Sequence, residues 1–181
     1  GDGKTDFVSA AKSSAKLALT TFLSTGRSLG AGSTQNTGTD AGNLGLLAMD
    51  VNGDRQGDVV MPVDQGGALS LYAYLSNGTG FGTSVQTATG RSAKALAYLP
   101  LDVDADGRED VVQLIEQSGK VGFVVFASTG TGTFSPAVTS STAFSTENLG
   151  FFPLDVNGDG RVDVVQGQRS GGSVQFVYYL S

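Results

Sequence analysis

The chain has 181 residues, of which 17 are acidic and 11 basic, and its formal net charge of −6 argues against nucleic acid or an anionic membrane surface as the main partner. With 39% hydrophobic residues there is enough apolar material for a core, which excludes a disordered acidic tail. The lack of Cys and His removes disulfides, thiolate metal sites and the commonest general base, and no run approaches the ~18 apolar residues of a membrane-spanning helix.

A nine-residue acidic motif recurs along the chain. It reads DVNGDRQGD at 50–58, DVDADGRED at 102–110 and DVNGDGRVD at 155–163, and residues 1–6 match its last six positions. The final aspartate of each copy falls at 6, 58, 110 and 163, so the spacings are 52, 52 and 53 residues. These spacings predict a single repeat array over 1–181, with repeats at 1–43 in part, 44–94, 95–147 and 148–181 in part.

A second landmark keeps the same period. Four apolar runs, at 17–23, 69–75, 121–127 and 174–180, are each followed by a serine, at 24, 76, 128 and 181. Two unrelated landmarks that share one period indicate about three and a half copies of one structural unit.

Within one copy every element is predicted to be a strand. A short apolar run precedes the acidic motif, and its copies lie at 44–49, 95–101 and 149–154. A Val-rich run follows the motif, at 59–63, 111–115 and 164–166. A Gly-containing turn leads into the run that ends at the serine, and a second turn leads into a weaker Thr- and Val-rich run. A repeat of ~50 residues with four strands is typical of a β-propeller blade.

The third run indicates how the sheets pack. Residues 121–126, VGFVVF, carry apolar side chains at both parities, so we expect both faces of this strand to be covered. We therefore predict an all-β fold, a β-propeller of four-stranded blades, with a β-solenoid or a β-sandwich as the alternative. Propellers have ~4–8 blades, so the ring is either partial, in a fragment, or closed by self-association, in which two chains would give about seven repeats.

The acidic motif has the residues of a calcium loop. Side-chain oxygens at its first, third, fifth and ninth positions, with a backbone carbonyl at the seventh, suit a hard cation that takes ~6–8 oxygen ligands. The predicted ligands of the three full loops are Asp50, Asn52, Asp54, Gln56 and Asp58; Asp102, Asp104, Asp106, Arg108 and Asp110; and Asp155, Asn157, Asp159, Arg161 and Asp163. In these loops Gln56, Arg108 and Arg161 contribute the carbonyl. Asp2, Lys4 and Asp6 are the remainder of a fourth, partial site.

The loops do not fit an EF-hand, and a metal-free alternative exists. An EF-hand needs a bidentate acid at its twelfth position and a helix afterwards, whereas these loops have Met61, Gln113 or Gln166 there and lead into a strand. The alternative is an Asx turn held by its own side chains without an ion. Carboxylates crowded into nine residues repel one another unless a cation neutralises them, which favours the calcium interpretation.

The loops are unequal. The sixth position is Gly in two loops but Arg55 in the first, where a positive φ is less readily adopted, so the first loop is expected to bind most weakly. Ten aspartates lie in the three full loops, and three Ca²⁺ ions would offset the net charge of −6. The acidity is therefore interpreted as cation sites.

The loops, the strand order and the stretch LSNGTGFG at 75–82 resemble FG-GAP/VCBS repeats, the blade units of integrin-α-type propellers. The stretches 155–166 and 176–181 are also similar to repeats of secreted Tc/Rhs-type toxins, and such repeats occur in propeller lectins. The resemblance implies a secreted, extracellular protein. It also implies that calcium braces the hairpin between the first two strands of each blade, away from the usual ligand surface.

Three functions are compatible with these observations. The first is a calcium-stabilised, non-catalytic recognition or scaffold module of a secreted protein, with a protein or glycan ligand. The second is a lectin with sugar sites between blades, for which Tyr72, Tyr74, Tyr98, Tyr178 and Tyr179 are candidates. Packing between blades is the favoured interpretation of these tyrosines, because most lie in apolar strand runs.

The third function is a glycosidase or lyase. It would use Asp64 and Glu116, acids outside the loops, because paired carboxylates can do acid–base work. Exposed turn charges are the alternative for these two acids and for Asp40, Glu109 and Glu147.

Overall fold

The computed structural model describes residues 2–40, 45–147 and 149–181. Within these ranges the chain forms strands and no helix, which confirms the all-β prediction. The strands are β1 (Phe7–Ser13), β2 (Lys16–Phe22), β3 (Ser33–Asp40), β4 (Leu47–Met49), β5 (Asp58–Gln65), β6 (Ala68–Tyr74), β7 (Val85–Ser92), β8 (Ala97–Leu101), β9 (Asp110–Gln117), β10 (Lys120–Phe126), β11 (Val138–Ser145), β12 (Gly150–Leu154), β13 (Asp163–Ser170) and β14 (Ser173–Tyr179).

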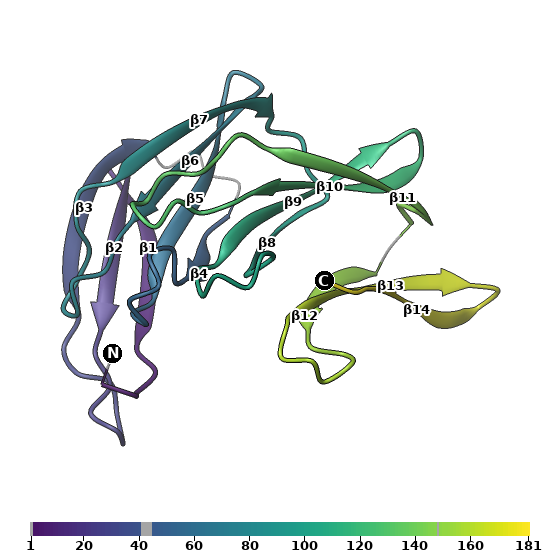
Figure 1. The fold of residues 1–181 in the computed structure, drawn as a ribbon. Coiled ribbons are helices and arrows are strands. Elements are labelled where there is room, and N and C mark those ends of the chain that lie inside the picture. The colour runs from purple at the N-terminus through teal and green to yellow at the C-terminus, as the bar shows by residue number, and fades with distance from the viewer. Residues whose placement is uncertain (1, 41–44, 148) are drawn as a thin grey trace.

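The strands form four antiparallel sheets in chain order. Two sheets have the predicted four strands, β4-β5-β6-β7 and β8-β9-β10-β11, while β1-β2-β3 and β12-β13-β14 have three. The run predicted at 44–49 is observed as β4, and residue 44 lies outside the described residues. The residues at the predicted repeat boundaries 43, 44 and 148 also lie outside them. The described sheets follow one another as an open fan (Figure 1).

The two middle sheets are buried on both faces. On one face of the β4–β7 sheet, Met61 and Tyr74 pack against Leu17 and Leu19 of the first sheet. On the other face, Leu69, Leu71 and Ala73 pack in one cluster with residues of the third sheet, namely Val111, Val124, Phe126 and Phe134. The prediction that the third run of a repeat is covered on both sides is therefore confirmed for β6 and β10.

Buried glutamines also join neighbouring sheets. The Gln113 Nε2 atom of β9 donates to the Ser92 carbonyl at the end of β7 (2.8 Å), and Gln166 Nε2 of β13 donates to the Ser145 carbonyl at the end of β11 (2.9 Å). Both glutamines are at most 1% exposed. Their amides donate to carbonyls of the preceding sheet. The first strands of neighbouring sheets also touch, since β4 contacts β8 and β8 contacts β12.

The outer edge of each of the first three sheets is protected by a bulge and a threonine. The last two strands of each of these sheets, β2–β3, β6–β7 and β10–β11, shift register at Lys16/Ala18, Ala68/Ser70 and Lys120/Gly122. At each shift a threonine hydroxyl of the outer strand donates to a carbonyl of its neighbour: Thr37 to Leu17 (3.0 Å), Thr89 to Leu69 (2.8 Å) and Thr142 to Val121 (2.8 Å). Bulges with polar side chains discourage strand addition at these edges.

The packing between sheets predicts the cost of a cavity. Phe126 is 1% exposed in the cluster between the second and third sheets, so Phe126→Ala should lower the free energy of unfolding by about 3–5 kcal/mol. Phe144→Ala is the matched control, because Phe144 is 44% exposed and should cost about 1 kcal/mol or less. Urea denaturation of both variants checks this, and equal losses would contradict the described interface.

Candidate metal-binding loops

The ninth residue of each acidic loop is a buried aspartate that accepts two backbone hydrogen bonds. One carboxylate oxygen accepts from a valine of the same loop, in the pairs Asp58–Val51 (3.0 Å), Asp110–Val103 (3.1 Å) and Asp163–Val156 (3.1 Å). The other oxygen accepts from a serine N–H 18 residues later, in the pairs Asp58–Ser76 (2.7 Å), Asp110–Ser128 (2.8 Å) and Asp163–Ser181 (2.9 Å). The three aspartates are at most 1% exposed.

The partial loop at the start of the chain makes the same bond. Asp6 Oδ1 accepts from the Ser24 N–H at 2.7 Å, again across 18 residues. The two landmarks of the sequence repeat, the last aspartate of the motif and the serine after the third run, are therefore hydrogen-bonded to each other in all four copies. This explains why they share one period.

Burial makes two of these carboxylates, Asp58 and Asp110, costly to ionise. Desolvation raises the pKa of Asp58 to about 6, against the lowering effect of the Ser76 and Val51 N–H groups, and nearby Asp54 and Asp50 raise it further. Desolvation likewise raises the pKa of Asp110. A cation close to such a carboxylate would favour its ionised form.

The first aspartate of each loop organises the turn around itself. Asp50 accepts from the N–H groups of Gly53 and Arg55, both at 2.8 Å. Asp155 accepts from Gly158 (2.7 Å) and Gly160 (3.0 Å) in the same way. The Asx turns that the sequence offers as a metal-free alternative are thus present, and they leave lone pairs on the same oxygens for a cation.

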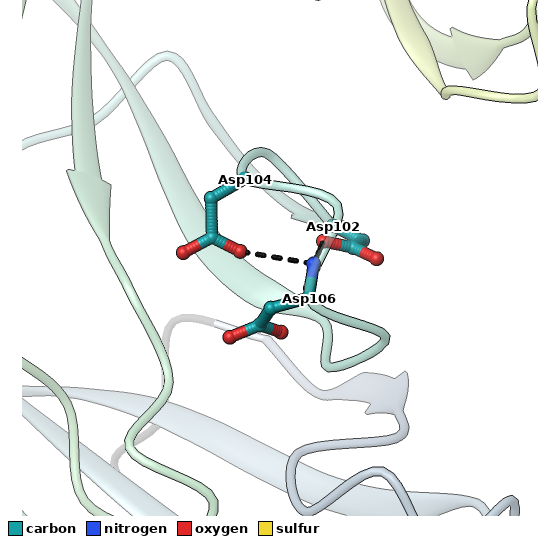
Figure 2. Close-up of side chains that lie close together, drawn as sticks. All are labelled: Asp102, Asp104 and Asp106. Carbon is teal, nitrogen blue, oxygen red and sulfur yellow. Dashed lines mark hydrogen bonds between the residues drawn. The ribbon is translucent and has the colours of Figure 1, made fainter.

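The second loop gathers three carboxylates. One ligand oxygen each from Asp102, Asp104 and Asp106 lies within 4.8 Å of the others, and Figure 2 shows all three projecting from one loop. The Asp106 N–H donates to Asp104 Oδ1 at 3.2 Å. Asp104 and Asp106 are exposed and Asp102 is half-buried, so the group is open to a cation from solvent.

The other two loops have an amide where the second loop has its middle carboxylate. Asn52 Nδ2 donates to Asp54 Oδ2 (3.0 Å), and Asn157 Nδ2 donates to Asp159 Oδ2 (2.9 Å). The Asn oxygens accept from the N–H groups of the same aspartates, at 3.0 Å and 2.9 Å. Asn replaces one negative charge but keeps an oxygen that a hard cation can use.

The seventh residue of each loop is bonded to the fifth. The backbone N–H donates to the fifth-position carboxylate in the pairs Gln56–Asp54 (2.8 Å), Arg108–Asp106 (2.9 Å), Arg161–Asp159 (2.8 Å) and, in the partial loop, Lys4–Asp2 (3.0 Å). The Arg108 guanidinium also pairs with Asp106 and partly neutralises the acidic group. The hydrogen bond from the Arg161 N–H lowers the pKa of Asp159. The hydrogen bond from the Lys4 ammonium, and after it the one from the Lys4 N–H, lowers the pKa of Asp2.

The sixth residue of every loop has a left-handed backbone. Its φ is +78° at Gly3, +85° at Gly107 and +86° at Gly160, and the first loop forces Arg55 to +65°. The first loop therefore has a strained residue at this position, since a non-glycine residue is disfavoured in this region. Its weaker binding of a cation stays a prediction.

Glu109 has a role that sequence reasoning missed. The interpretation of Glu109 as an exposed turn charge is wrong, because the residue is half-buried and bonds across two sheets. Its Oε2 accepts from the Asp50 N–H (2.6 Å) and its own N–H donates to the Asp50 carbonyl (2.8 Å), while burial raises the pKa of its carboxyl. An acid at the eighth position occurs in this loop alone, with Gly57 and Val162 at that position in the other full loops, and that difference was the available signal.

The remaining acids outside the loops occupy turns or the surface. Asp64 Oδ1 accepts from the Gly67 N–H (2.5 Å), and Glu116 Oε1 accepts from the Gly119 N–H (3.1 Å), so each caps the hairpin turn of its own sheet. Asp40 is exposed and pairs with Lys16 at 2.6 Å, and Glu147 is exposed. These acids therefore have the positions that the turn-charge interpretation expects.

Four of the five tyrosines pack within or between sheets. Tyr74 is 1% exposed and donates to Thr39 Oγ1, and Tyr179 meets Phe123 edge-on at 4.9 Å. Tyr98 is half-buried and donates to the Ala93 carbonyl (2.9 Å), while the half-buried Tyr72 accepts from Gln65 (2.7 Å). Tyr178 is 53% exposed.

Comparisons with known proteins agree with the repeat. The profile of the FG-GAP-like repeat matches residues 50–113 and again residues 102–165. Each match starts at the first aspartate of one full loop and extends past the last aspartate of the next. A search of curated proteins finds no match. No helix in the described part of the chain is long and apolar enough to cross a membrane.

The buried aspartate predicts a stability loss that needs no metal. Asp110→Ala leaves the N–H groups of Val103 and Ser128 without their acceptor, so in EDTA it should lower the free energy of unfolding by about 2–3 kcal/mol. Asp110→Asn, which retains one acceptor oxygen, should lose less. Asp64→Ala is the control. If both Asp110 variants lost no more free energy of unfolding than this control, the buried carboxylate would not hold the loop.

The strained sixth position of the first loop predicts that a glycine there would stabilise the fold. Arg55→Gly relieves a left-handed non-glycine residue and should raise the free energy of unfolding by up to about 1 kcal/mol, after the entropy of the new glycine is subtracted. Arg27→Gly, at a residue without a positive φ, should bring no gain. Thermal melts in EDTA measure both variants, and a loss at Arg55 would contradict the assigned strain.

Proposed function

The chain belongs to the FG-GAP-like repeat family, and we propose that it is a calcium-stabilised, non-catalytic recognition or scaffold module of a secreted protein. We further propose that its four sheets are blades of a β-propeller, with the loops on one end of the blades. The observation that carries the proposal is the group Asp102, Asp104 and Asp106, whose oxygens lie within 4.8 Å of one another in a loop that recurs along the chain.

Calcium is the cation that the available donors favour. The loops offer carboxylate, amide and carbonyl oxygens, and the chain has no His or Cys to attract softer metals. The proposed ligands of the second loop are the side chains of Asp102, Asp104, Asp106 and Asp110, with the Arg108 carbonyl. Corresponding residues would serve the first and third loops, and Asp2, Lys4 and Asp6 would belong to the partial one.

In this proposal calcium tightens a loop that already has its shape. The first aspartate holds the turn through backbone N–H groups, and the ninth ties it to the end of the third strand. A bound cation would remove the repulsion among the carboxylates and offset the cost of ionising the buried aspartate. The binding free energy then appears as added stability of the folded chain.

A secreted location fits such sites. Calcium-binding modules that work outside cells have dissociation constants of ~10⁻⁴ to 10⁻³ M, which match exposed loops with few charged ligands. The first and third loops have two carboxylates and one amide at their first, third and fifth positions, so we assign them to this range.

A second candidate function is carbohydrate binding, which one cavity favours. A hollow of about 590 Å³ is lined by residues of the second and third sheets and of the connection between them, among them Asp64, Lys94 and Tyr98. It lies at the end of the strands opposite the acidic loops, since β5 begins at Asp58 and ends at Gln65. A glycan array in millimolar calcium and in EDTA tests it, and binding to no sugar in either buffer would remove this candidate.

Calcium titration tests the main proposal. At about 100 times the dissociation constant, Ca²⁺ should add about 2.7 kcal/mol of stability for each occupied site. Asp106→Ala should remove the part of this stability gain that comes from the second loop, because Asp106 belongs to the carboxylate group of that loop. Asp64→Ala should retain the full gain. Calorimetry and melting in EDTA and in Ca²⁺ measure the effect, and no heat with no shift in melting temperature would contradict the proposal.

A further inference from the structure

The first two full acidic loops, at 50–58 and 102–110, are joined by a pair of hydrogen bonds. Glu109, the eighth residue of the second loop, donates its N–H to the Asp50 carbonyl at 2.8 Å. The Glu109 Oε2 atom accepts from the Asp50 N–H at 2.6 Å. Both backbone polar groups of Asp50, the first proposed ligand of the first loop, are therefore bonded to one residue of the neighbouring loop.

A serine that follows the second loop holds the next residue of the first loop. Ser128 Oγ donates to the Val51 carbonyl at 2.6 Å, and the Ser128 N–H donates to Asp110 Oδ1 at 2.8 Å. The Val51 N–H in turn donates to Asp58 Oδ2 at 3.0 Å. All four residues are at most 5% exposed. A continuous chain of buried hydrogen bonds thus joins the ninth residue of the second loop to the ninth residue of the first.

Backbone packing gives the same two loops a third contact. A Cβ atom on Gly53, in the first loop, would lie 3.3 Å from Arg108 Cγ and 3.5 Å from the Gly107 carbonyl oxygen, both in the second loop. The Arg108 side chain continues past Gly130, where a Cβ atom would lie 3.3 Å from Arg108 Cδ. The first loop therefore lies directly on the second, and glycine permits this close approach.

The second and third full loops lack such a connection. The eighth residue of the third loop is Val162, whose side chain has no acceptor. Among the residues that the structure describes, no hydrogen bond joins the loop at 155–163 to the loop at 102–110. The third loop is therefore an uncoupled comparison within the same chain.

We propose that Glu109 and Ser128 are positioning residues that couple the first two loops, so that a cation on the second loop raises the cation affinity of the first. The coupling rests on the proposed function, which assigns the cation. A cation bound through Asp110 orders the end of the second loop, and that end holds Asp50 and Val51. The first loop then binds at a lower entropic cost, because its first ligand is already in place.

The first loop has the most to gain from this support. Its sixth residue, Arg55, is held at a φ of +65°, whereas the second loop has Gly107 at this position. The strain at Arg55 opposes the turn in which Asp50 accepts two N–H groups, and the bonds from the second loop favour that turn. Coupling between sites is reciprocal, so a cation on the first loop raises the affinity of the second by the same factor.

A site-resolved calcium titration tests the coupling. The amide NMR signals of Gly53, Gly107 and Gly158 report the first, second and third loops, and calcium chloride is the titrant. Asp106→Ala removes a carboxylate of the second loop alone. It should weaken calcium binding at the first loop at least about fivefold, a usual size for coupling between sites, and leave the third loop unchanged. An unchanged or higher affinity at the first loop would overturn the proposal.

Variants of the positioning residues separate the hydrogen bonds from the charge. Glu109→Gln and Glu109→Val both remove the charge, but only Gln retains an acceptor for the Asp50 N–H. With Glu109→Gln, Asp106→Ala should still weaken binding at the first loop. With Glu109→Val and Ser128→Ala together, the same change should affect the first loop no more than the third. Equal weakening in both backgrounds would show that only the charge of Asp106 acts, and would overturn the proposal.

A calcium-free measurement tests the positioning by itself. The Gly53 N–H donates to Asp50 Oδ1 at 2.8 Å, and the Gly158 N–H donates to Asp155 Oδ1 at 2.7 Å in the third loop. In EDTA, Glu109→Val should speed exchange of the Gly53 amide about five- to tenfold, the factor expected from one lost hydrogen bond. Glu109→Gln should not speed it, and the Gly158 amide should be unchanged in both variants. Equal Gly53 exchange in the two variants would overturn the positioning role.

The titration also distinguishes failure of the coupling from failure of the proposed function. If no loop of the wild-type chain responds to millimolar calcium chloride, the proposed function fails, and the coupled affinities fail with it. If all three loops respond but Asp106→Ala leaves the first loop unaffected, the coupling alone fails.

Discussion

The fold depends on one buried carboxylate in each full acidic loop. In the three full loops the last aspartate is buried and accepts one N–H from its own loop and one from the serine that follows the next-but-one strand. It therefore joins the two connections at the same end of a sheet. A carboxylate is costly to bury, and the raised pKa of Asp58 expresses that cost, so the position is tolerated only because two donors face it.

Repetition of this unit determines how the sheets assemble. A strand with apolar side chains on both of its faces is not stable with one face in water, so each sheet requires a neighbour on each side. The β4–β7 and β8–β11 sheets have both neighbours, and polar links such as the Gln113 amide and the Glu109 carboxylate join them further. The first and last sheets each lack one neighbour in the described chain, and their outward apolar faces follow from the same requirement.

Much of this arrangement could be predicted from residue spacing. The period located the strands and loops because the Asp–Ser bond spans 18 residues in every copy. The left-handed sixth position was also predictable, because glycine stands there in all copies except at Arg55. Other features depend on neighbours across sheets: Glu109 reaches Asp50 over 59 residues, and Gln113 reaches Ser92 over 21. Local patterns carry no information on such contacts.

The ninth-position bond is the central claim, and hydrogen exchange of the serine amides tests it most directly. The N–H groups of Ser76 and Ser128 lie in no strand ladder, so without the aspartate bond they would exchange as fast as other turn amides. Amide exchange measured by NMR should show both protected nearly to the level of global unfolding, with further slowing in Ca²⁺. Exchange of both amides as rapid as that of an unfolded chain, in both buffers, would contradict the account.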